Sequence, residues 1–204
     1  ISFVRKNIKK FNLQAGSKES YLKIRNYYNS LPECSKDPRL LYTIILYGFN
    51  QQIRFNSNLE FNNPTCMRWF NDRVLEKLIS FSRHIKTLNV EFLNRNFIEF
   101  SSSIQLENFY YMDPPYMLTL GSYNDGKTGF SGWTKEHECE LFNFANKINQ
   151  HGAYFMISYV SEHKNKFNNE FISWVYDNNY NLIELPYIFG KNRKEILITN
   201  YNNL

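Results

Sequence analysis

The sequence is poor in cysteine and has no long apolar run, and each absence excludes a class of protein. Its cysteines, Cys34, Cys66 and Cys139, are widely spaced and form no Cys-x-x-Cys pair, which argues against a disulfide framework or a zinc site and favours a reducing cytoplasm. No stretch approaches the roughly 20 apolar residues that a membrane span needs, and no secretory signal is visible. We therefore expect a cytoplasmic protein without a membrane segment.

Two local features bear on metal binding and on chain length. His137-Glu138-Cys139 has metal-ligating side chains but no second ligand pair elsewhere, so we interpret it as a solvated helix face and expect no metal site. The first residue is Ile1 rather than Met, and we expect a longer parent protein.

Positive charge is concentrated at the beginning of the chain. The net charge is +5, yet residues 1–30 hold seven basic residues against one acidic residue, so the remaining residues sum to −1. A basic arm suits a nucleic-acid backbone, because each neutralised phosphate releases counterions. A solvated helix face explains the same charge equally well.

The first third of the chain indicates helices and one hairpin. Apolar residues at helical spacing predict helices within residues 1–30, and the apolar run 40–46 fits either a helix or a strand. Between residues 49 and 61, alternating apolar residues flank the polar pair Ser57-Asn58, which predicts a β-hairpin. We predict that residues 1–70 form a basic helical and β-hairpin module.

From residue 71 onward, helices and strands alternate, which predicts an α/β domain over residues 71–204 with a doubly wound, Rossmann-like sheet. An antiparallel pair joined through Gly190 closes it, and Thr134 is the expected cap of its central helix. The expected strands are 90–93, 109–112, 153–159, 182–185 and 195–199, and the expected helices are 71–87, 134–150 and 162–178.

The clearest chemical motif is Asp113-Pro114-Pro115-Tyr116, directly after the expected buried strand 109–112. Ligands of open α/β sheets bind beyond the carboxyl ends of the strands. The exocyclic amine of adenine is a poor nucleophile, because its lone pair is delocalised into the ring. The Asp113 carboxylate and the Pro114 carbonyl can accept hydrogen bonds from this amine and leave its lone pair aimed at a methyl donor.

The rest of the motif serves the same chemistry. The two prolines fix φ and pre-place the acceptors, and Tyr116 offers a ring on which a base flipped out of the duplex can stack. An ordinary proline turn after a strand is the alternative interpretation.

A second motif precedes this turn. Tyr47-Gly48-Phe49-Asn50, Arg54-Phe55-Asn56, Glu60-Phe61-Asn62 and Pro64 follow one another in the expected hairpin. With these two motifs in this order, the chain resembles the Dam-like (D12 class, alpha-group) family of adenine-specific DNA-N6 methyltransferases over nearly its whole length. Ile157-Ser158 and the segment 194–200 are similar to later core strands of that family.

The resemblance implies an enzyme that transfers a methyl group from S-adenosyl-L-methionine to a flipped-out adenine in double-stranded DNA, as in restriction-modification. It implies the following site residues: catalytic Asp113, Pro114, Pro115 and Tyr116; cofactor-binding Asn96, Phe97 and Asp113; and DNA-binding Phe49, Asn50, Gln52, Arg54, Asn56 and Arg68. Phe49 would wedge into the base stack, and Asn and Arg side chains pair with base edges. Asn96 stands where the family usually has Asp.

The elements that open the family are missing. The family begins with a strand leading into a Phe-x-Gly-x-Gly loop that cradles the methionine end of the cofactor, and a following strand ends in an acidic residue for the ribose hydroxyls. The eight glycines here include no Gly-x-Gly pair, so we expect a partial sheet whose first strands are absent. We expect either a truncated product or a separate N-terminal methyltransferase fragment that carries this loop. Two alternatives stay open: a catalytically inactive split or truncated methyltransferase that acts as a DNA-binding module, and an RNA amino-methyltransferase, against which the hairpin argues.

Overall fold

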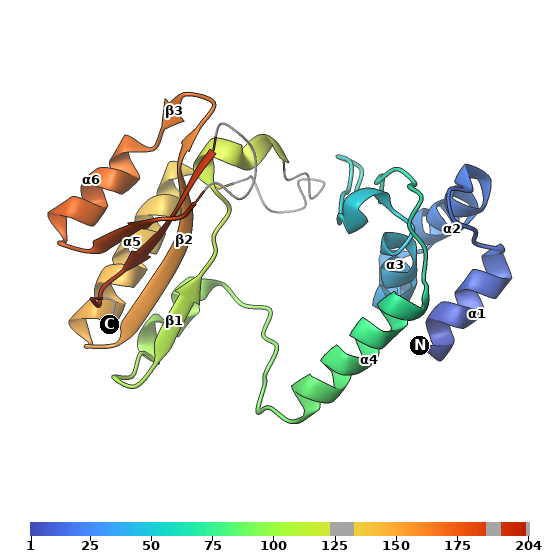
Figure 1. The fold of residues 1–204 in the computed structure, drawn as a ribbon, viewed down its shortest axis with the longest axis horizontal. Helices are drawn as coiled ribbons and strands as arrows, with labels where there is room; N and C mark the ends of the chain where they lie inside the picture. Colours follow the sequence, from blue (N-terminus) through green and yellow to red (C-terminus); the bar gives the residue numbers. More distant parts are fainter. Residues whose placement is uncertain (123–132, 187–192, 203–204) are drawn as a thin grey trace. The chain divides into compact units, whose positions relative to one another are not determined.

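The computed structural model describes residues 1–122, 133–186 and 193–202, which divide into two compact units (Figure 1). The first unit contains residues 1–92 and the second contains the described residues after them. Residues 71–92, which the sequence pattern joins to the α/β part, cluster with the first unit. Among the helices of the described residues, none has the length and apolar character needed to cross a membrane.

The first unit is mostly helical, as its sequence predicts. Side chains cap three of its helices: Ser17, Asp37 and Asn71 each accept a hydrogen bond from a backbone N–H of the first turn. The apolar run 40–46, which fits a helix or a strand by sequence, lies largely in a helix. The helices are α1 (Ser2–Phe11), α2 (Lys18–Ser30), α3 (Pro38–Ile45) and α4 (Asp72–Lys86), with short 3-10 turns η1 (Glu33–Ser35) and η2 (Phe49–Gln51).

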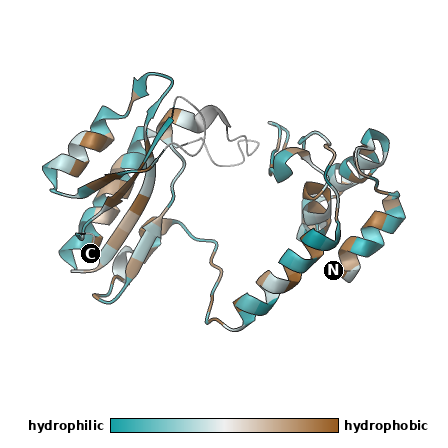
Figure 2. Cartoon of the chain, in the orientation of Figure 1, coloured by the Kyte–Doolittle hydropathy of each residue, from teal (hydrophilic) through white to brown (hydrophobic). Residues whose placement is uncertain are grey.

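A small core holds α1, α2 and α3 together. Tyr21 and Ile24 of α2, Ile44 of α3 and Phe61 of the hairpin are almost fully buried in one cluster. Figure 2 shows hydrophobic and hydrophilic bands alternating along α1 and α4, as expected of helices with one apolar face. On α4, however, no residue is fully buried.

The second unit is built on a mixed sheet. Its strand order is β1-β2-β5-β4, with β1 parallel to β2 and β5 antiparallel to both of its neighbours, and β3 pairs with the end of β2. The strands are β1 (Phe109–Met112), β2 (Tyr154–His163), β3 (Lys166–Phe167), β4 (Asn181–Glu184) and β5 (Arg193–Thr199). The helices are α5 (Lys135–Gln150) and α6 (Asn169–Asp177), with 3-10 turns η3 (Phe97–Ser102) and η4 (Met117–Ser122).

Helices α5 and α6 cover one face of this sheet. Phe155 and Ile157 of β2 are fully buried with Phe171 of α6 and Phe144 of α5. Side chains alternate between the two faces of a strand, and the alternate residues are exposed: Phe109 by 54%, Tyr111 by 58% and Tyr154 by 53%. The described residues thus form a partial mixed sheet, which is compatible with a methyltransferase fold but lacks the second helical layer of a doubly wound sheet.

Three sequence predictions about residues 71–204 need correction. Residues 90–93 form no strand; Val90 and Phe92 are exposed, and an apolar run makes a strand only where a partner strand lies beside it. The strand 109–112, expected to be buried, is exposed on one side and only partly buried on the other. The helix expected over 162–178 is confined to α6, because β2 continues to His163 and β3 follows. The expected turn at Gly190 lies outside the described residues.

Candidate active site and nucleic-acid interface

The Asp113-Pro114-Pro115-Tyr116 turn begins where β1 ends, as the sequence predicts. The Tyr116 hydroxyl donates a hydrogen bond to Asp113 Oδ1 (2.6 Å) and lies 3.2 Å from Ser158 Oγ on β2. Asp113 is exposed. Within the described residues, neither its Oδ2 atom nor the Pro114 carbonyl accepts a hydrogen bond. At the carboxyl end of β1, two acceptors are therefore free of donors from the described part of the chain.

Tyr116 supports the turn from inside the protein. Only 9% of it is exposed; its ring packs edge-on against Tyr159 at 5.6 Å between centroids, and the Arg193 guanidinium carbon lies 5.3 Å from its centroid. Burial, reinforced by the hydrogen bond to Asp113, raises the pKa of Tyr116 to about 12. The phenol thus stays protonated at neutral pH and donates to Asp113. Stacking of a flipped base on this ring stays a prediction, and it requires the ring to become uncovered.

A buried polar network lies directly behind the turn. The Tyr159 hydroxyl donates to Glu138 Oε1 of α5 and accepts from the backbone N–H of Met117 at 3.3 Å. Asn168 Nδ2 donates to the same Glu138 oxygen at 2.8 Å. Burial and the Glu138 carboxylate both raise the pKa of Tyr159. This network ties α5 and β2 to the residue that follows the candidate catalytic turn.

The sequence interpretation missed this network and placed Glu138 on a solvated face, which is wrong. Glu138 is only 2% exposed. Its spacing from Leu141, Ala145 and Ile148, three buried residues of α5, puts it on the apolar stripe of that helix. That spacing was the available signal, although an acidic residue on such a stripe does not reveal its partners.

We predict that Tyr159→Phe destabilises the protein by about 1–3 kcal/mol. The substitution leaves the buried Glu138 carboxylate with one donor fewer and the Met117 N–H without its acceptor. The free energy of unfolding from urea titration measures the effect. Tyr176→Phe, at a position that is 67% exposed on α6, is the matched control and should change stability by less than about 0.5 kcal/mol. Equal stability of both variants would contradict the role of the network.

The two residues assigned to the cofactor by resemblance lie at the start of η3. Asn96 Oδ1 accepts from the Ile98 N–H at 3.1 Å, and Glu99 Oε1 accepts from the Asn96 N–H at 3.0 Å. Asn96 and Glu99 thus form a capping box. The Phe97 ring packs edge-on against Phe144 of α5 at 5.6 Å. η3 is thereby fixed to the same core as β1 and the turn, and cofactor contact by Asn96 and Phe97 stays a prediction.

In the first unit, the expected hairpin is present in an irregular form. A single antiparallel bridge joins Phe55 to Phe61, whose rings meet edge-on at 5.5 Å. Asn56 Oδ1 accepts from the N–H groups of Asn58 (3.0 Å) and Glu60 (2.9 Å), and its Nδ2 donates to Glu60 Oε2. Asn56 therefore shapes the tip of the hairpin, and a contact from its side chain to DNA stays a prediction.

Helix α2 holds the base of the hairpin. The Phe61 N–H donates to Asn29 Oδ1 (2.8 Å), and Asn29 Nδ2 donates back to the Phe61 carbonyl (3.0 Å). The Tyr21 hydroxyl donates to the Asn63 carbonyl at 2.8 Å, and Asn63 Nδ2 donates to the carbonyl of Phe49. These contacts fix the returning strand of the hairpin to α2 and tie it to Phe49 of η2.

The other residues assigned to DNA are available on the surface. Phe49 is 49% exposed, and Asn50, Gln52 and Arg54 are exposed beside it. Arg68 is also exposed, and its guanidinium donates a long hydrogen bond (3.5 Å) to Gln51 Oε1. The structure thus gathers the hairpin residues and Arg68 in the first unit, and the Asp113 turn with Asn96 and Phe97 in the second.

The sequence matches the family model described as D12 class N6 adenine-specific DNA methyltransferase over residues 1–189. The chain belongs to this family. It is 36% identical to Modification methylase StsI of Streptococcus sanguinis over 97% of its length, and 35% identical to Type II methyltransferase M.FokI of Planomicrobium okeanokoites over its full length. It is 31% identical to Modification methylase LlaI of Lactococcus lactis subsp. lactis over 98% of its length.

The chain covers 31%, 32% and 32% of these three relatives, which is about a third of their length. Family membership therefore extends over nearly all of this chain, while most of each relative has no counterpart in it.

Proposed function

We propose that this chain is the catalytic and recognition part of a site-specific adenine-N6 DNA methyltransferase of the restriction-modification type. The observation that carries the proposal is a pair of acceptors at the carboxyl end of β1, Asp113 Oδ2 and the Pro114 carbonyl, to which no group of the described residues donates. The hairpin that exposes Phe49, Asn50 and Arg54 supports duplex DNA as the partner. The three free cysteines fit the cytoplasm as the compartment.

In the proposed reaction, the two acceptors act on the amine of a flipped-out adenine. Asp113 Oδ2 accepts a hydrogen bond from one N–H and the Pro114 carbonyl accepts from the other, which draws the nitrogen toward tetrahedral geometry. Its lone pair then points away from the turn. The hydrogen bond from Tyr116 to Asp113 Oδ1 keeps the carboxylate oriented, so the acceptors need no rearrangement when charge develops on the amine.

The residues of this chain fit S-adenosyl-L-methionine in part. The cofactor, when bound, supplies the sulfonium methyl group that the amine attacks. Phe97, fixed against α5, and Asp113 are the residues that would lie beside it, whereas the Asn96 side chain is engaged in its capping box. The sequence has no Gly-x-Gly pair to let a backbone approach the methionine end.

We further propose that a segment outside this chain completes the sheet. The outer edge of β1 has no neighbour among the described strands, and Phe109 and Tyr111 beside it are exposed. Strands with parallel partners are normally covered on both faces. A separate N-terminal methyltransferase fragment that carries the glycine loop would supply both the missing strand and the missing part of the cofactor site.

Calorimetric titration of the isolated chain with S-adenosyl-L-methionine tests whether a separate fragment is needed to complete the cofactor site. We expect no heat signal that fits a dissociation constant in the micromolar range, because the glycine loop is absent. Addition of the N-terminal fragment of a related methylase should strengthen binding. Micromolar binding by the isolated chain would contradict the proposal that the site is completed from outside.

A catalytically inactive DNA-binding module is the second candidate, and the absence of a Gly-x-Gly pair favours it. The two candidates differ in the role of Asp113. If the chain only binds DNA, then the wild type transfers no methyl group and Asp113→Ala leaves the affinity for duplex unchanged.

A further inference from the structure

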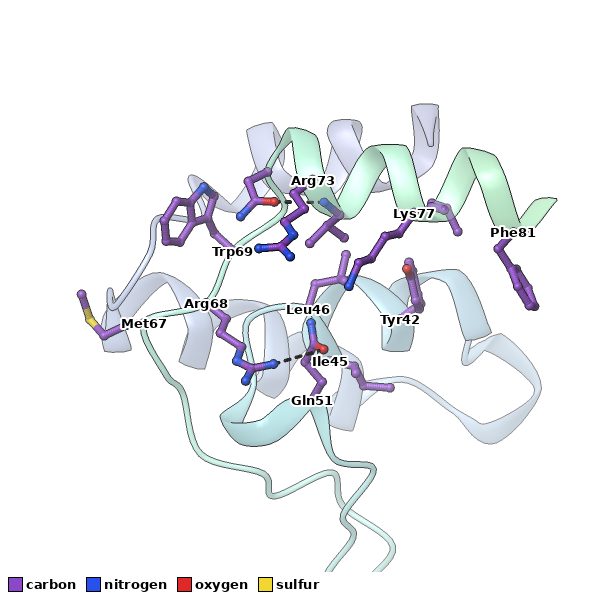
Figure 3. Close-up of a pocket in the computed structure, with 13 residues that line it drawn as sticks. Tyr42, Ile45, Leu46, Gln51, Met67, Arg68, Trp69, Arg73, Lys77 and Phe81 are labelled. Carbon is purple, nitrogen blue, oxygen red and sulfur yellow. Dashed lines mark hydrogen bonds between the residues drawn. The ribbon is translucent and has the colours of Figure 1, made fainter. Parts of the chain in front are cut away.

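The first unit contains a groove whose lining residues take no part in the contacts that hold the hairpin to α2. It lies between the C-terminal end of α3 with η2 on one side and α4 with the segment before it on the other, and has a volume of about 800 Å³. Figure 3 shows Arg73 and Lys77 extending into it from α4, while Arg68 reaches in beside Gln51. We call it the α4 groove, and the residues that matter here are Gln51, Arg68, Trp69, Arg73, Lys77 and Phe81.

The charge of the α4 groove is unbalanced. Arg68, Arg73 and Lys77 line it, and among the described residues no acidic side chain does. Within the described part of the chain, none of these three cations forms an ion pair. Arg73 and Lys77 are four residues apart on one helix, which separates them by about 6 Å along its axis, so each can meet a different anionic group.

The walls of the groove also expose aromatic surface. Trp69 is 47% exposed and Phe81, at the other end of the groove, is 61% exposed; Met67, at the same end as Trp69, is 72% exposed (Figure 3). An apolar protein partner would have to desolvate three unpaired cations, which is costly. A nucleic-acid strand instead brings phosphates to the cations and the faces of sugars and bases to the aromatic rings.

We propose that the α4 groove binds the sugar-phosphate backbone of the DNA substrate, with Arg73 and Lys77 neutralising phosphates and Trp69 lying against the strand. The inference rests on the proposed function and extends it, because it assigns DNA contacts to α4 outside the hairpin. These contacts are to phosphates and so add affinity without reading sequence.

The test uses the full chain and a duplex oligonucleotide, with dissociation constants measured over a range of salt concentrations. Each lost phosphate contact lowers the slope of log K against log salt by about 0.9. For the double substitution Arg73→Gln with Lys77→Gln, we expect the slope to fall by about 2 and the affinity at about 0.15 M salt to fall roughly 30-fold. The control, Arg83→Gln with Lys86→Gln, removes the same charge from exposed positions of α4 outside the groove and should have a much smaller effect.

Tryptophan fluorescence gives a second readout. Trp133 and Trp174 are only 6% and 8% exposed, so DNA-dependent quenching should come from Trp69 and disappear in Trp69→Phe. Equal loss of affinity in the two double variants, or unchanged Trp69 emission with saturating DNA, would overturn the proposal. A change in Trp69 emission with protein concentration alone would assign the groove to a second copy of the chain and overturn it as well.

The outcomes separate this proposal from the proposed function. If the wild-type chain binds no duplex at all, both the DNA partner and the α4 groove are wrong. If the wild-type chain binds duplex and only the hairpin variant Arg54→Gln weakens binding, the DNA partner stands and the α4 groove proposal fails.

Discussion

Asp113→Ala is expected to lower the rate of methyl transfer by a factor on the order of 10³. The substitution removes a pre-placed acceptor for the adenine amine, so the nitrogen loses the interaction that directs its lone pair. Asp113 is exposed and lies at the end of β1 rather than in the core, so the fold should be retained. The measurement is single-turnover transfer of labelled methyl groups to duplex DNA by the chain completed with an N-terminal fragment.

The binding of DNA is the internal control for this variant. The exposed hairpin residues belong to the other compact unit, so the affinity of Asp113→Ala for duplex should stay within about twofold of the wild type. Asp113→Asn keeps one acceptor oxygen and should retain more activity than the alanine variant. Full transfer activity of Asp113→Ala would show that the turn is structural.

Phe61→Ala is expected to destabilise the first unit by about 3–5 kcal/mol. Phe61 is fully buried and packs edge-on against Phe55, and its backbone N–H and carbonyl both bond to the side-chain amide of Asn29. Loss of the ring leaves a cavity where the hairpin meets α2, so the affinity for duplex should fall together with stability. Thermal and urea unfolding monitored by circular dichroism, with DNA binding measured below the transition, gives both quantities.

A matched substitution in the same hairpin tests whether the loss of stability comes from the buried ring of Phe61 or from any change made in the hairpin. Leu59 lies two residues away and is 37% exposed, so Leu59→Ala should change the free energy of unfolding by less than about 0.5 kcal/mol. If Phe61→Ala unfolds at the same midpoint as Leu59→Ala, then the hairpin is not anchored through the helical core.

Elements with local signals were predicted well from the sequence. Thr134 caps α5 as expected, since a threonine before an apolar-periodic segment stabilises the first turn whatever lies around it. The amphipathic pattern of residues 71–87 likewise predicted α4. The position of Asp113 at the end of β1 was also predictable, because two prolines cannot continue a strand.

Features that depend on a neighbour could not be predicted. Residues 90–93 have strand-like composition, yet whether they pair depends on another segment. Glu138 is buried because Tyr159 and Asn168 reach it from other elements, and neither lies near it in the sequence. The α4 groove likewise arises where residues of α3, η2 and α4 meet. The resemblance singled out Arg68, but Arg73 and Lys77 appear in the sequence only as scattered charges.

The identity of the methylated nucleoside tests the central claim most directly. The completed protein is incubated with duplex DNA and S-adenosyl-L-methionine, and the digested DNA is analysed by mass spectrometry. We predict N6-methyl-2′-deoxyadenosine at a defined sequence with the wild type and none with Asp113→Ala. Methylation of cytosine, or the same adenine product without Asp113, would contradict the account.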